Sequence, residues 1–342
     1  MYAFENKIEE MLRSENIAGA AVALTDREGI VFSRGFGVES VERPSVPVTA
    51  DSVFRIASIT KVVTGILTMR LVEQGVLELD RPVRDYIPWL EIKDKAALPL
   101  ITLRLLLSHR AGFPAEYTPV GPRDEAALEP SLMDAIPKLD LAYFPNEGYI
   151  YSNWGIRLVS LAIERTVGRR YSELAREMVL VPLGMNKATF DLNTAATYPL
   201  ALPHERDESG MPRVSHLIKE NFARLATGGI YSSASELTAL ARLLLNGGVA
   251  DSGERLISEA SLFEMMRINT QHDSGNGYGL TMQMHPLPAG HKSYGHYGNA
   301  DPYTSAMFVS PESGYGAVVM LNTYSKSLRE RICDAMLSEL VK

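Results

Sequence analysis

The chain has 342 residues, of which 46% are hydrophobic and 22% charged, and its formal net charge is −7. This composition is typical of a globular protein, long enough for one large domain or two lobes, and its charge disfavours nucleic acid and anionic membranes as partners. The sequence contains no run of 18 apolar residues, so we expect no membrane-spanning helix. A single cysteine, Cys333, excludes an intrachain disulfide, and we expect it to be buried in a helix.

The first ten residues are acidic and amphipathic, and they lack the basic-then-apolar order of a secretory signal. We therefore expect a cytoplasmic protein, with a mature secreted form as the alternative. The oligomeric state is left open.

The first third of the chain predicts two strands and three helices. Two apolar runs flank the turn residues 25–29 and predict a hairpin. A later amphipathic stretch predicts a helix that ends at Gly75. The predicted elements are a helix at 5–13, strands at 18–24 and 30–36, and helices at 62–74 and 102–109.

The middle of the chain predicts mainly helices. Residues 112–145 contain six prolines and predict a segment that is mostly loop, which either overhangs the site or is a passive surface excursion. Residues 194–214 are polar and predict loops or short strands inserted in the fold. Helices are predicted at 156–167, 171–179 and 235–245.

The end of the chain returns to strands, at residues 304–309 and 316–322, before a final helix at 327–340. Strands at both ends and helices between them predict an α/β protein of the α+β type, with an antiparallel sheet flanked by helices and an inserted, mainly helical lobe. We expect one domain over 1–342, with a sheet lobe of 1–57 and 276–342 and a helical lobe of 58–275. A site in the cleft between the lobes would be a common arrangement.

The most informative short motif is Ser58-Ile59-Thr60-Lys61, at the start of a predicted helix. Residues three apart share one helix face, so the Ser58 hydroxyl and the Lys61 amine would meet there. A buried lysine has a lowered pKa and can serve as the base that activates a serine. The alternative is a helix N-cap serine followed by a solvated lysine.

Two later motifs complete an ordered triple: Tyr151-Ser152-Asn153 and His296-Tyr297-Gly298. With this triple the chain resembles the serine β-lactamase-like superfamily, in the branch of class C β-lactamases, low-molecular-weight penicillin-binding proteins, D-amino-acid peptidases and related esterases. The resemblance extends along nearly the whole chain, through further segments at 19–37, 107–114, 181–185, 227–233 and 278–280.

The resemblance implies a β-lactamase/transpeptidase-like fold and assigns roles to the triple. Ser58 would be the nucleophile that accepts the acyl group, and Lys61 with Tyr151 would be the general base and acid. Asn153 would bind a substrate carbonyl and Lys61, although it could instead cap the helix that follows it. The N–H groups of Ser58 and Asn299 would stabilise the oxyanion.

The third motif departs from the lactamase pattern at several positions. His296 replaces a lysine, and a neutral imidazole anchors a substrate carboxylate less well than an ammonium group. Tyr297 stands where a small residue is usual, so it would crowd the cleft or offer a new hydroxyl. After Gly298 the glycine-rich continuation is replaced by Asn299-Ala300-Asp301-Pro302. We therefore expect slow or absent β-lactam turnover.

Other motifs argue against competing site classes. The histidines outside the triple lack a zinc-binding frame, no Gly-x-Ser-x-Gly elbow is present, and no phosphate-binding glycine pattern appears, so we expect no metal and no cofactor. These histidines are His204, His216, His272, His285 and His291, and we interpret His109 as structural.

The leading hypothesis is a serine hydrolase acting on a small ester, amide or peptide; the alternatives are a penicillin-binding-like sensor or scaffold without turnover, and an acyltransferase.

Overall fold

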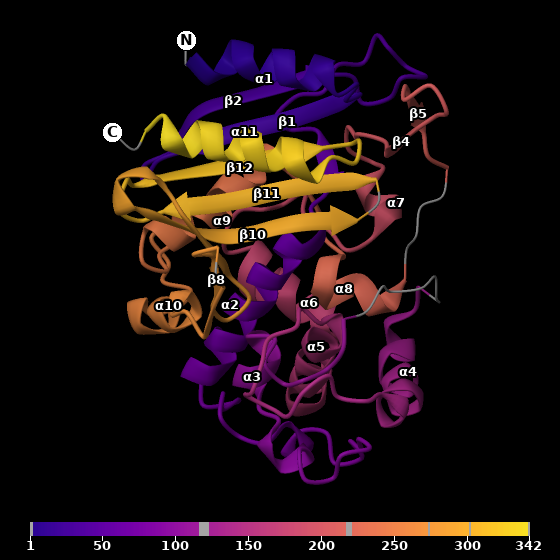
Figure 1. Cartoon of the computed structure of the whole chain (residues 1–342), viewed down its shortest axis with the longest axis vertical. Coiled ribbons are helices and arrows are strands. Elements are labelled where there is room, and N and C mark those ends of the chain that lie inside the picture. The colour runs from indigo at the N-terminus through magenta and orange to yellow at the C-terminus, as the bar shows by residue number, and fades with distance from the viewer. Residues whose placement is uncertain (1–2, 116–122, 217–220, 273, 301, 341–342) are drawn as a thin grey trace.

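The computed structural model describes residues 3–115, 123–216, 221–272, 274–300 and 302–340. Its central element is an eight-stranded antiparallel sheet in the order β2-β1-β12-β11-β10-β9-β8-β7 (Figure 1). The strands of this sheet are β1 (Gly19–Thr25), β2 (Ile30–Gly37), β7 (Thr270–Gln271), β8 (Gly277–Tyr278), β9 (Gln283–Pro286), β10 (Lys292–Ala300), β11 (Tyr303–Ser310) and β12 (Tyr315–Leu321).

The sheet is assembled from both ends of the chain, as the sequence predicted. β1 pairs with β12 in a register that places Ala20 opposite Leu321. The turn between β1 and β2 is held by Asp26, whose Oδ1 accepts the N–H groups of Glu28 and Gly29. The antiparallel sheet and its flanking helices confirm the predicted α+β class.

Helices cover both faces of the sheet, and β1 and β11 are buried along their whole length. One face packs on α1 (Ala3–Ser14) and α11 (Lys326–Ser338), and the other on α9 (Ala234–Leu245) (Figure 1). Side chains of a strand alternate between the faces, which is why Ala20 and Val22 join the α11 core while Ala21 and Ala23 join the larger core. Cys333 is buried in α11, as expected.

The remaining helices form the lower part of the molecule in Figure 1. Around the central α2 (Thr60–Glu73) lie α3 (Leu103–Leu107), α4 (Leu128–Ala135), α5 (Asn153–Val167), α6 (Tyr171–Ala175), α8 (Leu225–Gly228) and α10 (Glu259–Met266). α7 (Leu192–Ala195) and the hairpin of β4 (His204–Arg206) and β5 (Pro212–Val214) fall in the stretch predicted to hold loops or short strands. α9 belongs to the predicted helical lobe of residues 58–275 but packs on the sheet. The division of the chain into two lobes at these boundaries therefore stays a proposal.

The prediction for residues 112–145 missed a helix. α4, with a 3-10 turn on either side of it, lies within the segment predicted to be mostly loop. Pro130 is in the first turn of α4, where a missing N–H costs nothing, and Pro137 follows the end of the helix. Leu128, Leu132 and Ile136 bury one face of this segment. Residues 116–122 of the predicted loop lie outside the described residues.

Candidate active site

Ser58 lies on a sharp connection between a short strand and the central helix. β3 (Val53–Arg55) pairs with β6 (Tyr231–Ser233), and the Ile56 N–H donates to Ile230 O at 2.9 Å. A 3-10 turn, η1 (Ala57–Ile59), then leads into α2. Ala57 adopts a φ of +50°, a left-handed conformation that a residue with a side chain seldom takes. This turn leaves Ser58 half-buried, directly ahead of α2.

Lys61 projects from the first turn of α2 toward Ser58, as the spacing predicted. Its Nζ is 3.1 Å from Ser58 Oγ and 2.7 Å from Thr227 O, at the end of α8. The side chain is fully buried, and burial together with the positive charge of Arg157 holds the pKa of Lys61 well below its usual range. Burial therefore favours the uncharged amine of Lys61, the form that can accept a proton.

Tyr151 lies beside this pair, just before α5. Lys61 Nζ is 4.9 Å from the centre of the Tyr151 ring. The Tyr151 hydroxyl is buried and has no partner in hydrogen-bond geometry among the described residues. Burial raises the pKa of Tyr151, and the nearby Ser58 hydroxyl offsets only part of that rise. Burial thus favours the neutral forms of both groups, a Lys61 amine and a Tyr151 phenol.

Asn153 is the first residue of α5, two positions after Tyr151. The N-cap of this helix is Ser152, so Asn153 does not occupy the capping position that was its alternative role. Ser152 fixes the start of the helix through its own contacts: its N–H donates to His109 Nδ1 at 3.2 Å and its hydroxyl donates to Pro114 O at 2.8 Å. Asn153 is half-buried.

Gly298 allows β10 to pack directly against η1. A Cβ at this position would lie 2.1 Å from Ser305 Oγ and 2.4 Å from Ile56 O. The Ser305 hydroxyl donates to Ile56 O at 2.7 Å, so β10 and β11 hold the residue that begins the Ser58 turn. The triple predicted from sequence is therefore brought together by strand, turn and helix.

β10 also has a free edge close to this turn. β9 pairs only with Lys292 to Gly295, whereas β11 pairs along β10 as far as Ala300. The Tyr297 N–H donates to Gln283 Oε1 at 3.0 Å, on the side away from β11. Backbone groups two residues apart point the same way in a strand, so the Asn299 N–H points to this free edge as well.

Tyr297 is not in the cleft, so the expectation that it would crowd the cleft or offer a hydroxyl there is wrong. It lies on the opposite face of β10 from His296 and Gly298, because side chains alternate along a strand. There its ring packs against Phe308, with ring centroids 4.6 Å apart, and against the Arg329 guanidinium. The Asn299 side chain shares this far face and accepts from Arg329 Nη1 at 2.8 Å.

His296 is committed to contacts within the protein. Its Nε2 is 3.1 Å from the Tyr278 hydroxyl, and its Nδ1 contacts Tyr297 O. The same Tyr278 hydroxyl is 3.1 Å from His109 Nε2. Burial, with a smaller contribution from Lys61, lowers the pKa of His296 to about 3. At neutral pH this position thus holds an uncharged ring, as the sequence comparison with a lysine implied.

A family model described as Beta-lactamase matches residues 4–336 of the chain, which include all the residues of this site. The chain belongs to the beta-lactamase family. It is 26% identical to "Penicillin-binding protein 4" of Amycolatopsis lactamdurans over 332 residues, which cover 93% of this chain and 84% of that protein.

Solved structures of beta-lactamase-like proteins share the fold. A penicillin-binding protein homologue from Pyrococcus abyssi, described as octameric, superposes with a TM-score of 0.84 at 25% identity, over 99% of this chain and 76% of that one. A D-amino acid amidase from Ochrobactrum anthropi SV3 superposes with a TM-score of 0.81 at 22% identity, over 99% of each chain.

Three residues of this beta-lactamase-family site were not predicted to be part of it. Tyr278 and Thr227 belong to segments that were recognised only as family resemblances, and His109 was interpreted as structural. The structure places the His109 ring 4.4 Å from the Tyr151 ring and Thr227 O on Lys61. The signal that could have found them was the family resemblance of segments 107–114, 227–233 and 278–280, to which the sequence analysis gave no role in the site.

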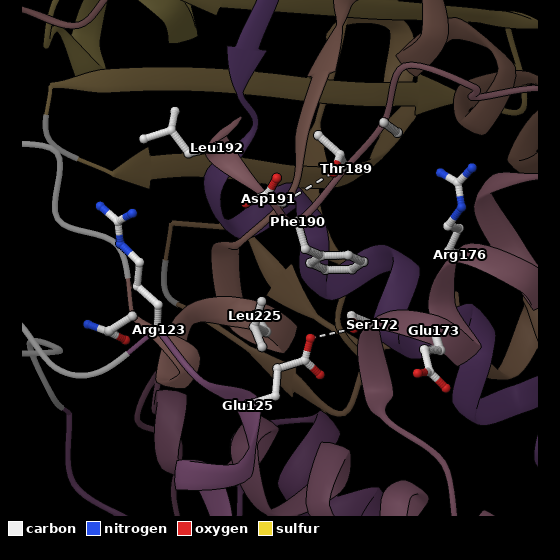
Figure 2. Close-up of a pocket in the computed structure, with 12 residues that line it drawn as sticks. Arg123, Glu125, Ser172, Glu173, Arg176, Thr189, Phe190, Asp191, Leu192 and Leu225 are labelled. Carbon is white, nitrogen blue, oxygen red and sulfur yellow. Dashed lines mark hydrogen bonds between the residues drawn. The ribbon is translucent and has the colours of Figure 1, made fainter. Parts of the chain in front are cut away.

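A pocket lies away from the Ser58 site and contains none of the predicted site residues (Figure 2). It has a volume of about 380 Å³ and lies between α6, α8 and the segment that precedes α7. Its charged side chains are of both signs. The Ser172 hydroxyl donates a hydrogen bond to the Glu125 carboxylate, and the Asp191 side chain caps α7. We assign it no chemistry.

The described residues include no group of three or more histidine, cysteine or acidic side chains placed to hold a metal ion. Within the same part of the chain, every helix is too short or too polar to cross a membrane.

Proposed function

We propose that the protein is a serine hydrolase that works through a covalent acyl-enzyme on Ser58. The observation that carries this proposal is the buried Lys61 amine, 3.1 Å from Ser58 Oγ. The amine also contacts Thr227 O, which supplies no negative charge to hold a proton on it. A neutral amine in contact with a serine hydroxyl is what general-base activation of that serine requires.

In the proposed acylation step, Ser58 Oγ attacks the substrate carbonyl carbon and its proton passes to Lys61 Nζ. The N–H groups of Ser58 and Asn299 stabilise the negative charge on the carbonyl oxygen. The Tyr151 phenol gives its proton to the leaving group as the bond to that group breaks, and the Lys61 ammonium restores the proton to Tyr151.

In the deacylation step, a water molecule loses a proton to the Lys61 amine as its oxygen attacks the acyl carbon. The bond to Ser58 Oγ breaks, and the Lys61 ammonium returns the proton to the serine. Asn153 and the free edge of β10 would position the acyl group. An acyltransferase would differ only in using another nucleophile in place of water.

We propose small esters and amides or short peptides as substrates. The family relationship, a relative named as a penicillin-binding protein and the fold shared with a D-amino acid amidase support a serine hydrolase acting on amide bonds. The alternative of a sensor without turnover drew on Tyr297, and that residue is on the far face of β10, where it cannot obstruct the cleft.

The test is hydrolysis of p-nitrophenyl butyrate by the wild type, by Ser58→Ala and by the control Ser131→Ala on α4. We expect turnover in the wild type and the control, loss of turnover in Ser58→Ala, and an acyl adduct on Ser58 by intact mass. Equal rates in the wild type and Ser58→Ala would refute the nucleophile. A stable adduct without product release would support the sensor.

For β-lactams we expect slow or absent turnover, because His296 is an uncharged and hydrogen-bonded ring where a lactamase carries an ammonium group. Nitrocefin and p-nitrophenyl butyrate are to be compared under the same conditions. A kcat on nitrocefin comparable to the kcat on the ester would contradict this expectation.

A further inference from the structure

The chain of hydrogen bonds beneath the site has one consistent direction. The Ser152 N–H can only donate, so His109 Nδ1 is an acceptor and His109 Nε2 carries the proton that points to Tyr278. Tyr297 O can only accept, so His296 Nδ1 carries a proton. The Tyr278 hydroxyl proton is then left with His296 Nε2 as its acceptor.

This direction requires His296 to be neutral. A doubly protonated His296 would have no lone pair on Nε2 and would leave the Tyr278 proton without a described acceptor. Tyr278 is 1% exposed, so water does not replace that acceptor, and a buried hydroxyl without a partner is unfavourable. The hydrogen bonds alone therefore make Nδ1 of His296 a donor and Nε2 an acceptor, and they require the ring to be uncharged.

Other basic side chains that the structure describes near Ser58 are also buried and contact protein atoms. Lys61 contacts Ser58 Oγ and Thr227 O, and Arg55, which is 3% exposed, donates from its Nε to Gly228 O. Arg157 is 3% exposed, with Nε on Ala223 O and its guanidinium 4.7 Å from the centre of the Trp154 ring. Arg329 is 2% exposed and lies on the far face of β10.

We propose that this site selects acyl donors with no carboxylate beside the scissile bond, and that Tyr278 enforces the selection by holding His296 Nε2 as an acceptor. A carboxylate brought into the site would lose its hydration and gain no cation in return. Tyr278 is thus a positioning residue that acts through His296. The inference rests on the proposed function, because it concerns the substrates of the Ser58 site.

The test compares phenyl butyrate with 3-carboxyphenyl butyrate, which differ in one carboxylate on the leaving group. For each ester, kcat/KM at pH 7.5 is divided by its rate of alkaline hydrolysis, which removes the difference in intrinsic reactivity. We expect the wild type to prefer the neutral ester by about tenfold or more, a difference of about 1.4 kcal/mol.

The Tyr278→Phe variant keeps the ring and removes the hydroxyl that occupies His296 Nε2. We expect its preference for the neutral ester to fall several-fold, because the uncharged imidazole can then carry its proton on Nε2 instead of Nδ1 and present an N–H donor to the carboxylate. The groups that face His296 are Lys61, Tyr151, Tyr278 and His109, with Arg329 and His285 acting at longer range.

Tyr303→Phe is the matched control for Tyr278→Phe. It also removes one buried hydroxyl, which donates to Ala201 O at 2.7 Å, and it should leave the preference unchanged. Where Tyr278→Phe does not fold, ¹⁵N NMR of the wild type at pH 6 tests the same assignment: His296 should carry its proton on Nδ1 alone.

Two outcomes would overturn the selection while leaving the hydrolase in place: equal or faster turnover of the carboxylate ester by the wild type, or a doubly protonated His296 at pH 6. A third outcome is different in kind. Ser58-independent turnover of both esters, without an acyl adduct, would overturn the proposed function and the selection together.

Discussion

At the scale of single residues, the site depends on an amine that burial keeps uncharged. Lys61 carries no carboxylate partner in its described contacts, only Ser58 Oγ and Thr227 O. Such a lysine is useful as a base because burial lowers its pKa. The same burial lowers the stability of the folded protein, because it disfavours the charged form of the amine. The pKa of Lys61 is lower in the folded chain than in the unfolded chain, so protonation of this group opposes folding.

We therefore expect Lys61→Met to lose activity and gain stability. Loss of the base should lower kcat/KM on p-nitrophenyl butyrate by about 10²- to 10⁴-fold. Because the folded pKa lies below the unfolded pKa, the wild type loses stability as pH falls from the unfolded value toward the folded one, and Met removes that loss at pH 7. The melting temperature should rise by about 2–4 °C for each kcal/mol recovered.

Lys95→Met is the control for this prediction, since Lys95 is exposed and its nearest charged partner is Glu91. Its activity and melting temperature should stay close to those of the wild type. A Lys61→Met protein that melts lower than the wild type, or keeps its activity, would contradict the neutral-amine assignment.

The residue scale also marks what the sequence can predict of the site. Ser58, Lys61 and Tyr151 came from motif spacing, and the structure brings them together. The position of Tyr297 outside the cleft could also be predicted from the sequence, because side chains alternate along a strand and Tyr297 follows His296 directly. The contact of Tyr278 with His109 was not predictable from local spacing, because the two residues are 169 positions apart in the chain.

At the scale of elements, the approach of β10 to η1 determines where Ser58 sits. Gly298 has no room for a side chain, since its neighbours are the backbone oxygen of Ile56 and the hydroxyl of Ser305. The prediction of α2 succeeded because its helical pattern is continuous, whereas α4 was missed because proline content alone does not distinguish a helix start from a loop.

We expect Gly298→Ala to displace η1 and lower kcat/KM by at least about tenfold, since a shift of about 1 Å in catalytic geometry can cost 10²-fold. Gly29→Ala is the matched control, because no atom lies within 4 Å of the added Cβ there. Activity on p-nitrophenyl butyrate and the melting temperature are measured for both. A fully active Gly298→Ala would refute the role given to this close contact.

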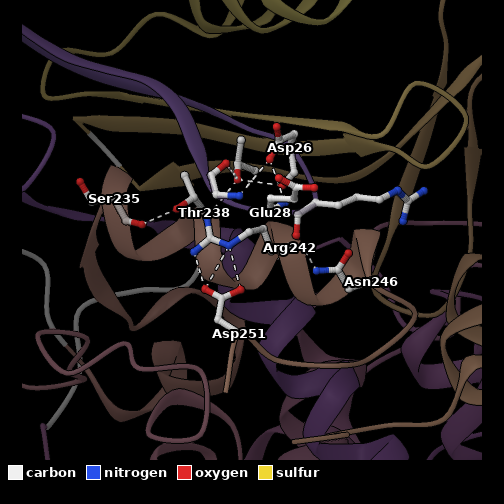
Figure 3. Close-up of polar contacts among 10 residues, drawn as sticks. Asp26, Glu28, Ser235, Thr238, Arg242, Asn246 and Asp251 are labelled. Carbon is white, nitrogen blue, oxygen red and sulfur yellow. Dashed lines mark hydrogen bonds and ion pairs between the residues drawn. The ribbon is translucent and has the colours of Figure 1, made fainter. Parts of the chain in front are cut away.

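α9 is tied to the sheet by a polar cluster around Arg242 (Figure 3). Arg242 Nε donates to Asp251 Oδ1 at 2.8 Å, and its Nη1 donates to Thr25 Oγ1 and Thr238 Oγ1 at 3.0 and 3.1 Å. Arg242 is 8% exposed, whereas the Asp251 side chain is 45% exposed. One guanidinium thus joins α9, β1 and the loop after α9.

Asp251→Asn should lower the free energy of unfolding by about 1–3 kcal/mol, because it leaves a buried guanidinium without its counter-charge. The exposure of Asp251 keeps the effect below that of a fully buried pair. Urea denaturation measures it, with Asp85→Asn at the exposed Arg81 pair as a control that should change by about 0–1 kcal/mol. Equal changes in the free energy of unfolding for Asp251→Asn and Asp85→Asn would contradict the proposal that the Arg242 cluster stabilises the fold more than an exposed ion pair does.

At the scale of the whole molecule, buried neutral histidines make the fold sensitive to acid. Burial lowers the pKa of His296 to about 3 and holds the pKa of His109 well below 6.5. Between pH 6.5 and pH 3 the unfolded chain takes up protons at these residues and the folded chain does not, so stability falls as the pH falls.

Chemical denaturation at pH 7, 6, 5 and 4 should therefore give a steadily decreasing free energy of unfolding. His216, which is exposed, provides the control, and His216→Gln should leave the slope unchanged. His296→Gln should reduce the slope over the same range. A wild-type stability that is flat from pH 7 to pH 4 would contradict the neutral burial of these rings.

The pairing of β1 with β12 has a consequence for how the protein is made. About 300 residues separate Ala20 from its partner Leu321, and at 5–20 residues per second a ribosome needs roughly 15–60 s to synthesise them. During that interval the first hairpin has emerged without the strand that will cover its open edge, and exposed edges invite pairing with other chains. A nascent β1–β2 hairpin therefore stays without its partner strand until β12 has been synthesised, and slowing translation between β2 and β12 should lower the yield of native protein.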